Sequence, residues 1–98
     1  MNYNHVTLEM LKDYAFIVIE SMKSDKDYQN SDVLKDYAVL YLNFINSLEN
    51  NNAIYSKQKF TRIESLSRAY LEVDSDWSKP FLEKMYEFEK LGRKYYSL

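Results

Sequence analysis

Few residues in this chain have the chemistry that catalysis needs. The only histidine, His5, lies near the N-terminus, where a general base or metal ligand is hard to position, and there is no cysteine. Cys–His or Ser–His nucleophiles and zinc sites therefore lack support. A single glycine excludes a glycine-rich phosphate loop, and the aspartates of residues 24–30 lack the closing glutamate of an EF-hand. We expect no enzyme activity, no metal and no cofactor.

Aromatic and cationic residues gather near the C-terminus. Of the ten tyrosines, Tyr37, Tyr41 and Tyr70 fall on apolar stripes and are expected in the core with their hydroxyls at the surface. The aromatic and cationic residues near the C-terminus form a predicted protein-binding surface. It comprises Trp77, Tyr86, Lys90, Arg93, Lys94, Tyr95 and Tyr96. Aromatic and arginine side chains dominate the hot spots of protein interfaces. The cations would also complement the negative end of a helix dipole, which is the structural alternative.

A second group of cations falls in residues 57–72. This segment has a net charge of +2, because it holds four cations, Lys57, Lys59, Arg62 and Arg68, and two acids, Glu64 and Glu72. A basic helix can enter the major groove of DNA. The overall charge of −2 and the long Asn-rich connection before this segment disfavour such a role, and a solvated charged face is the other interpretation.

Apolar residues recur at spacings of three and four, which is the period of an amphipathic helix. The pattern predicts helices at about 7–24, 31–49, 56–73 and 79–95. Their stripes are Leu8, Leu11, Ala15, Val18 and Met22; Leu34, Tyr37, Tyr41, Ile45 and Leu48; Phe60, Ile63, Leu66, Tyr70 and Val73; and Phe81, Met85, Phe88 and Tyr95. The acidic residues mostly fall off these stripes and are expected in solvent.

Several helix ends carry local signals. Thr7, Ser31 and Ser78 are predicted N-caps, with Asn30 as the alternative to Ser31. Pro80 suits a first turn because its missing N–H has no partner there. The third helix has two possible starts, at Ser56 or at the capping box of Thr61 and Glu64. Gly92 lies within the last stripe and either permits close approach of another helix or marks fraying. Of these two interpretations, fraying is slightly favoured.

The composition is that of one globular domain spanning residues 1–98. Apolar residues make up 46% and charged residues 29%, and one Gly and one Pro are too few for a many-stranded β fold. Short connections make successive helices antiparallel neighbours, so we predict an all-α antiparallel four-helix bundle. The longest uncharged run, 37–48, is too short to span a membrane, and no leader pattern opens the chain. We expect a cytoplasmic monomer or homodimer.

The layout resembles the pediocin-like (class IIa) bacteriocin immunity protein family. The resemblance is carried by residues 23–35 between the first two helices, the 37–48 helix, Phe60-x-x-Ile63, and residues 81–93. It implies a four-helix bundle in the cytoplasm of a Gram-positive producer, which it protects from its own pore-forming peptide. It also implies binding at the inner side of a membrane sugar-transporter receptor that holds the bacteriocin. The C-terminal half would select the bacteriocin.

Two other functions remain open from the sequence. One is a small phage or mobile-element regulator that inhibits a host protein by docking a helix face in a groove. The other is a DNA-binding regulator that uses the basic segment at residues 57–72.

Overall fold

The structure, a computed structural model, describes residues 5–49, 53–73 and 78–97. Its elements are α1 (Leu8–Lys23), the short 3-10 helix η2 (Tyr28–Asn30), α2 (Asp32–Leu48), α3 (Ala53–Ile63), α4 (Leu66–Val73) and α5 (Pro80–Tyr96). These described residues form no strand, and the predicted all-α helical bundle is confirmed. None of the described helices is both long and apolar enough to cross a membrane.

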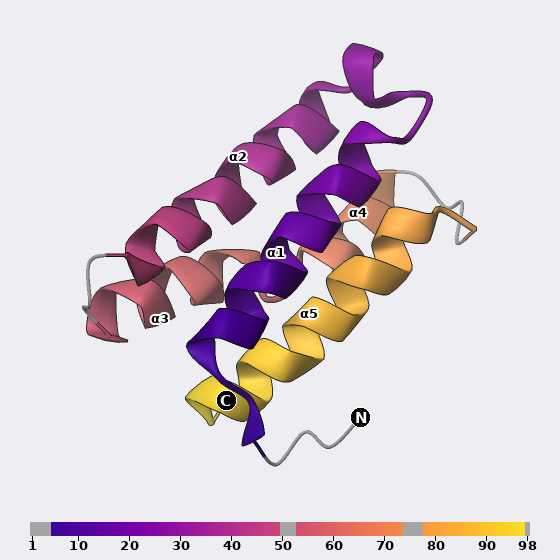
Figure 1. Cartoon of the computed structure of the whole chain (residues 1–98). Coiled ribbons are helices and arrows are strands. Elements are labelled where there is room, and N and C mark those ends of the chain that lie inside the picture. Colours follow the sequence, from indigo (N-terminus) through magenta and orange to yellow (C-terminus); the bar gives the residue numbers. More distant parts are fainter. Residues whose placement is uncertain (1–4, 50–52, 74–77, 98) are drawn as a thin grey trace.

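Helix α1 lies between α2 and α5 and packs against both. In Figure 1 the chain runs one way along α1 and the opposite way along α2 and α5, whereas α3 crosses behind them. Helix α3 packs mainly against α2, and α4 packs against α5. The C-terminal half of α5 therefore lies beside the junction between α3 and α4.

One apolar core joins all five α-helices. At its centre the rings of Phe44, Phe60 and Phe88 contact one another with centroids 5.5 to 6.1 Å apart. The ring of Tyr41 packs at a tilt against Phe88, with centroids 5.1 Å apart. Aromatic pairs at such separations add to the free energy gained by burying their surface. The buried apolar residues are Leu11, Ala15, Val18, Ile19, Met22, Leu34, Ala38, Tyr41, Phe44, Ile45, Phe60, Ile63, Tyr70, Phe81, Leu82, Met85, Phe88 and Leu91.

Two of the three predicted N-caps are confirmed. Thr7 Oγ1 accepts from Met10 N, and Ser31 Oγ accepts from Leu34 N, each at 3.1 Å. The Ser78 prediction is wrong, because the N-cap of α5 is Lys79, whose side chain makes no capping bond. Pro80 occupies the first turn as predicted.

The side chain of Lys79 points instead to the connection between α1 and α2. Its Nζ lies 3.2 Å from Asp25 and 3.1 Å from Asp27. Lys79 and Asp25 are almost fully buried, whereas Asp27 is 59% exposed. The hydrogen bond to Asp27 is the largest cause that raises the pKa of Lys79 above its usual value. This ion pair holds the start of α5 against the α1–α2 connection.

The predicted third helix is two helices. It begins at Ala53 rather than Ser56, and the chain leaves the helical path at Glu64 and Ser65 before α4 begins. The capping box at Thr61 is also wrong, because Thr61 lies inside α3 and its hydroxyl donates back to Gln58 O at 2.7 Å.

The stripes need four corrections. Leu8 (36%), Val73 (64%) and Tyr95 (38%) are exposed, because Leu8 begins α1, Val73 ends α4 and Tyr96 takes the inward position at the end of α5. The hydroxyl of Tyr41 does not reach the surface. It is buried and has no hydrogen-bond partner among the described residues.

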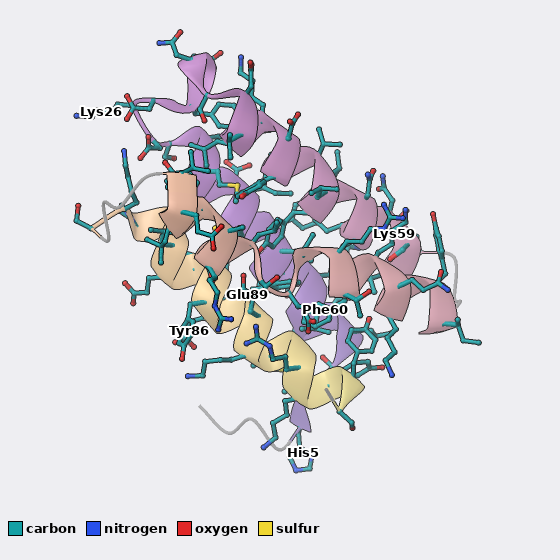
Figure 2. The ribbon with its side chains drawn as sticks, turned by 180° about the vertical axis from the view of Figure 1, so that it is seen from behind. His5, Lys26, Lys59, Phe60, Tyr86 and Glu89 are labelled. Atoms are coloured by element: carbon teal, nitrogen blue, oxygen red, sulfur yellow. The ribbon has the colours of Figure 1, made fainter. Side chains whose placement is uncertain are left out.

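Gly92 is buried inside α5, which continues to Tyr96, so the prediction of fraying is wrong. A Cβ atom at this position would overlap the ring of Phe60 from α3. Figure 2 shows Phe60 between these two helices. Gly92 therefore permits the close approach of a neighbouring side chain, which is the other of the two predicted alternatives.

Candidate protein-binding site

The outward side of α5 carries three of the predicted binding residues. Tyr86, Lys90 and Lys94 follow one another at intervals of four residues, which places them along one side of the helix. Tyr86 is 54% exposed, and Lys90 Nζ lies 5.4 Å from the centroid of its ring. Figure 2 shows Tyr86 pointing away from the bundle. We call these three residues the Tyr86 strip.

Tyr96 faces the bundle and takes no part in the strip. Its ring lies 5.3 Å from that of Phe60, and its hydroxyl donates to Ser56 Oγ at 2.9 Å. Burial raises the pKa of the Tyr96 hydroxyl. Tyr95 packs edge-on against Tyr96 with centroids 4.9 Å apart. Of the other predicted residues, Trp77 lies outside the described residues, and Arg93 turns toward α3.

Glu89 is a buried carboxylate that binds the start of α4. Its oxygens accept from Ser67 N at 3.0 Å and from Ser67 Oγ at 2.7 Å. Because Ser67 is in the first turn of α4, where backbone N–H groups lack helical acceptors, Glu89 supplies the cap that this helix needs. Burial raises the pKa of Glu89, and the bonds from Ser67 and the charge of Arg93 oppose that rise.

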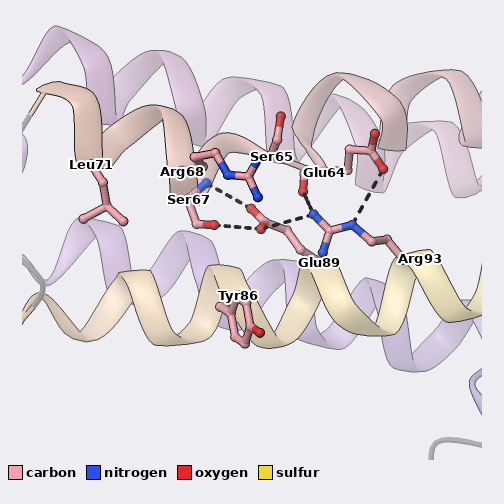
Figure 3. A pocket seen from close by; sticks show the side chains of 8 residues that line it. All are labelled: Glu64, Ser65, Ser67, Arg68, Leu71, Tyr86, Glu89 and Arg93. Atoms are coloured by element: carbon pink, nitrogen blue, oxygen red, sulfur yellow. Dashed lines mark hydrogen bonds and ion pairs between the residues drawn. The ribbon is translucent and has the colours of Figure 1, made fainter. Parts of the chain in front are cut away.

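Arg93 caps the end of α3, as Glu89 caps the start of α4. Its guanidinium donates to the carbonyl oxygen of Glu64, where the terminal carbonyls of α3 have no helical donor. It also lies 3.9 Å from the carboxylates of both Glu64 and Glu89. Glu89 and Arg93, one turn apart on α5, thus bind both sides of the break between α3 and α4 (Figure 3). We call this pair the junction clamp.

Beside the clamp, a groove opens between α4 and α5. It encloses about 410 Å³, and Leu71, Arg68 and Tyr86 line it together with the clamp. A neighbouring hollow of about 310 Å³ shares Ser67, Leu71 and Tyr86 with it. Arg68 makes no hydrogen bond or ion pair with another described residue. The α4–α5 groove therefore offers an apolar wall and one unpaired cation directly next to the Tyr86 strip.

Sequence reasoning missed Glu89, Arg68 and Leu71 as parts of this region. The signal for Glu89 is its spacing, because Met85, Glu89, Gly92 and Tyr96 are separated by four, three and four residues and all face inward. A carboxylate at a core position needs a partner. The expectation that acidic residues lie in solvent is wrong for Glu89, which is 1% exposed.

The predicted basic segment is divided by the break. Lys57, Lys59 and Arg62 lie on α3, whereas Arg68 lies on α4. Lys59 Nζ lies 5.2 Å from the ring centroid of Tyr55, so part of this charge packs on its own helix. Residues 57–72 thus do not form the continuous basic helix on which the DNA-binding hypothesis depends.

Within the part of the chain that the structure describes, no three histidine or acidic side chains are close enough to hold a metal ion. Comparisons with protein families, with curated proteins and with solved structures found no match to this chain.

Proposed function

We propose that this protein is a bacteriocin immunity protein that binds, through α5, the cytoplasmic side of a complex between a pore-forming class IIa peptide and its receptor. The observation that carries the proposal is the Tyr86 strip beside the α4–α5 groove. The sequence resemblance described above supports the choice of partner, a membrane sugar transporter that holds the bacteriocin.

The chemistry of this region suits a protein partner. A half-exposed tyrosine next to a groove buries a large ring at little cost in conformational freedom, which is typical of interface hot spots. Lys90 and Lys94 are exposed and suit the acidic rim of a partner surface. Leu71 and Arg68 add an apolar wall and a cation to the same surface.

The test is protection of a bacteriocin-sensitive strain that expresses the protein. We expect survival against at least one member of a panel of class IIa peptides, and loss of that protection in Tyr86→Ala. Truncation of a central interface tyrosine weakens binding by about 2 kcal/mol or more, about thirtyfold. Unchanged sensitivity to the whole panel would contradict the proposal.

The chain offers a matched control on α3. Tyr55 and Lys59 form the same tyrosine–lysine pair at a spacing of four residues, with 5.2 Å between Lys59 Nζ and the ring centroid. Tyr55 is 39% exposed. Tyr55→Ala should keep protection, at equal expression of both variants. Equal loss in the two variants would place the binding surface elsewhere.

A second candidate function is favoured by the α4–α5 groove itself. A groove with an apolar wall can receive side chains from a helix or loop of a host enzyme that the protein then inhibits. Capture experiments with the wild type and Tyr86→Ala separate the two functions. Transporter subunits alone, lost in the variant, support immunity, and a soluble host enzyme lost in the same way supports the inhibitor.

A further inference from the structure

The outer face of α1 and α2 carries an apolar groove that none of the described helices fills. It encloses about 250 Å³. Ile19 and Ala38 form its buried floor, and Phe16, Leu42 and Val39 stand beside it with exposed fractions of 42%, 45% and 55%. In Figure 1, α3 and α4 lie behind α1 and leave this face open.

Charges are arranged on this face in a regular order. On α1, Glu9, Phe16 and Lys23 follow at intervals of seven residues, and on α2 the order is reversed as Lys35, Leu42 and Glu49. Seven residues are close to two turns, or about 10 Å, so each set lies along one side of its helix.

The opposite directions of the two helices bring like charges together. Lys23 and Lys35 both line the groove at the end near η2. Glu9 is in the first turn of α1 and Glu49 is the C-cap of α2, so both lie at the ends of these helices away from η2. Glu20 also lines the groove, so the end near η2 carries two lysines and one carboxylate. The face thus has an end of net positive charge, an apolar middle and an acidic end. None of the side chains of Lys23, Lys35, Glu9 and Glu49 makes a hydrogen bond or ion pair within the part of the chain described.

Helix dipoles do not account for this order. An acidic residue in the first turn and a lysine in the last turn stabilise α1. On α2, Lys35 lies beyond the first turn and Glu49 is at the C-cap, where the dipole disfavours an acid. The dipole of α2 therefore gives no reason for the positions of these two charges.

We infer that a second copy of this chain binds on this face. The two copies are related by a two-fold axis that lies in the plane of the face, at right angles to both helices, and passes near Phe16 and Leu42. Such an axis places Glu9 opposite the partner's Lys23 and Lys35 opposite the partner's Glu49. Phe16 and Leu42 then meet their own counterparts. A two-fold axis parallel to the helices would instead place basic end on basic end, so the charges select one orientation.

The size of the face sets the expected strength. The helices have 16 and 17 residues and are therefore about 25 Å long. A surface two helices wide is smaller than the ~800 Å² per partner of a standard stable interface. The dimer should therefore dissociate reversibly in the micromolar range.

The experiment is sedimentation velocity of the full chain from about 1 µM to 1 mM. Lys35→Glu and Glu49→Lys should each raise the dissociation constant at least tenfold, because each creates two repulsive contacts in a symmetric dimer. The double variant should recover to within about threefold of the wild type. Within one chain the two positions are about 21 Å apart, beyond the screening length at physiological salt, so recovery requires contact between copies.

Leu42→Ser tests the apolar middle and should abolish the dimer. Leu42 is already 45% exposed, so the helical circular dichroism of the variant should stay as in the wild type. Lys57→Glu, an exposed lysine on α3, is the matched control and should leave dimerisation unchanged. A monomer at all concentrations, a dimer insensitive to Lys35→Glu, or a double variant as weak as the single ones would each overturn the inference.

Discussion

Phe60 and Gly92 depend on each other at the level of single residues. The Phe60 ring is fully buried among Phe44, Phe88 and Tyr96, and it occupies the space that a side chain at position 92 would need. A ring enclosed on these sides has little freedom to move, because protein interiors are close-packed.

Gly92→Ala should therefore destabilise the protein, although alanine is the better helix former by about 1 kcal/mol. Overpacking a core costs about 1–3 kcal/mol, so we expect a net loss of up to about 2 kcal/mol in urea unfolding. Adding Phe60→Leu to Gly92→Ala should cost less than the sum of the two single changes. Strict additivity would show that the ring is not the obstacle.

Glu89 predicts a pH effect with a definite sign. Burial raises its pKa in the folded state, so between the unfolded and folded pKa values the native protein binds more protons than the unfolded chain. Stability from this group is complete below the unfolded pKa of about 4.3 and is lost as pH rises through the folded pKa.

Glu89→Gln removes that titration. Its free energy of unfolding, measured relative to the wild type in urea, should increase between pH 4.5 and pH 7.5. Exposed carboxylates titrate in both proteins, so their contributions to the free energy of unfolding cancel in the difference. A relative stability of Glu89→Gln that falls with pH would contradict the raised pKa.

At the level of elements, the junction clamp binds both sides of the point where the predicted third helix divides. Arg93→Ala removes the donor to the terminal carbonyl of α3 and leaves Glu89 without its neighbouring cation. We expect a loss of about 1–2 kcal/mol, since a charged hydrogen bond is worth ~1.5–3 kcal/mol and the Arg93 side chain is 37% exposed. Hydrogen exchange should accelerate in α3 and α4 first.

Lys90→Ala is the comparison for this change. Lys90 is 45% exposed, and its distance of 3.9 Å to Glu87 is that of a weak surface ion pair. Its effect on unfolding should stay within about 0.5 kcal/mol. Equal destabilisation by the two substitutions would mean that the clamp contributes nothing beyond surface charge.

The two aspartates that bind Lys79 make a second matched pair. Asp25 is almost buried, and its carboxylate also accepts from Asp27 N at 2.9 Å, whereas Asp27 is 59% exposed. Asp25→Asn should lower stability by more than about 1 kcal/mol, because it weakens a buried pair and a turn together. Asp27→Asn should cost less than about 0.5 kcal/mol, because solvent screens this exposed carboxylate although its hydrogen bond is the largest cause of the raised pKa of Lys79. Denaturant unfolding at neutral pH measures both, and the reverse order would be a contradiction.

The elements that could be predicted are those whose signals are local. Thr7 and Ser31 cap helices that begin one residue later, so a short stretch of sequence contains the donor and the acceptor. The residues that flank the break at Glu64 and Ser65 are bound by Glu89 and Arg93, which are 22 to 29 residues from the groups they bind. Periodicity within the third segment could not reveal partners so distant. The N-cap of α5 is Lys79 rather than the predicted Ser78, and the side-chain partners of Lys79, Asp25 and Asp27, are likewise distant in the sequence.

At the scale of the whole molecule, the stripes predicted the bundle because amphipathic helices with short connections have few other ways to bury their apolar faces. The position of the candidate site on α5 was also predictable from composition. Which of its residues face outward was not, because Tyr95 and Tyr96 are neighbours in the sequence and only packing against Phe60 distinguishes them.

A single core predicts a single unfolding transition. Every α-helix contributes to the same buried cluster, so α4 and α5 should not unfold separately from α1 and α2. Far-ultraviolet circular dichroism and near-ultraviolet tyrosine absorbance should give the same midpoint in urea, at a protein concentration below the onset of dimerisation. Two separate midpoints would indicate a second cooperative unit.

The junction clamp also has a consequence for the growing chain during translation. Thr7 and Ser31 lie directly before the helices that they cap, so α1 and α2 have their caps as soon as they are synthesised. The facing ends of α3 and α4 must wait for Glu89 and Arg93, which the ribosome adds 22 to 29 residues later. Until α5 emerges, the facing ends of α3 and α4 lack these side-chain partners, so this junction is completed last.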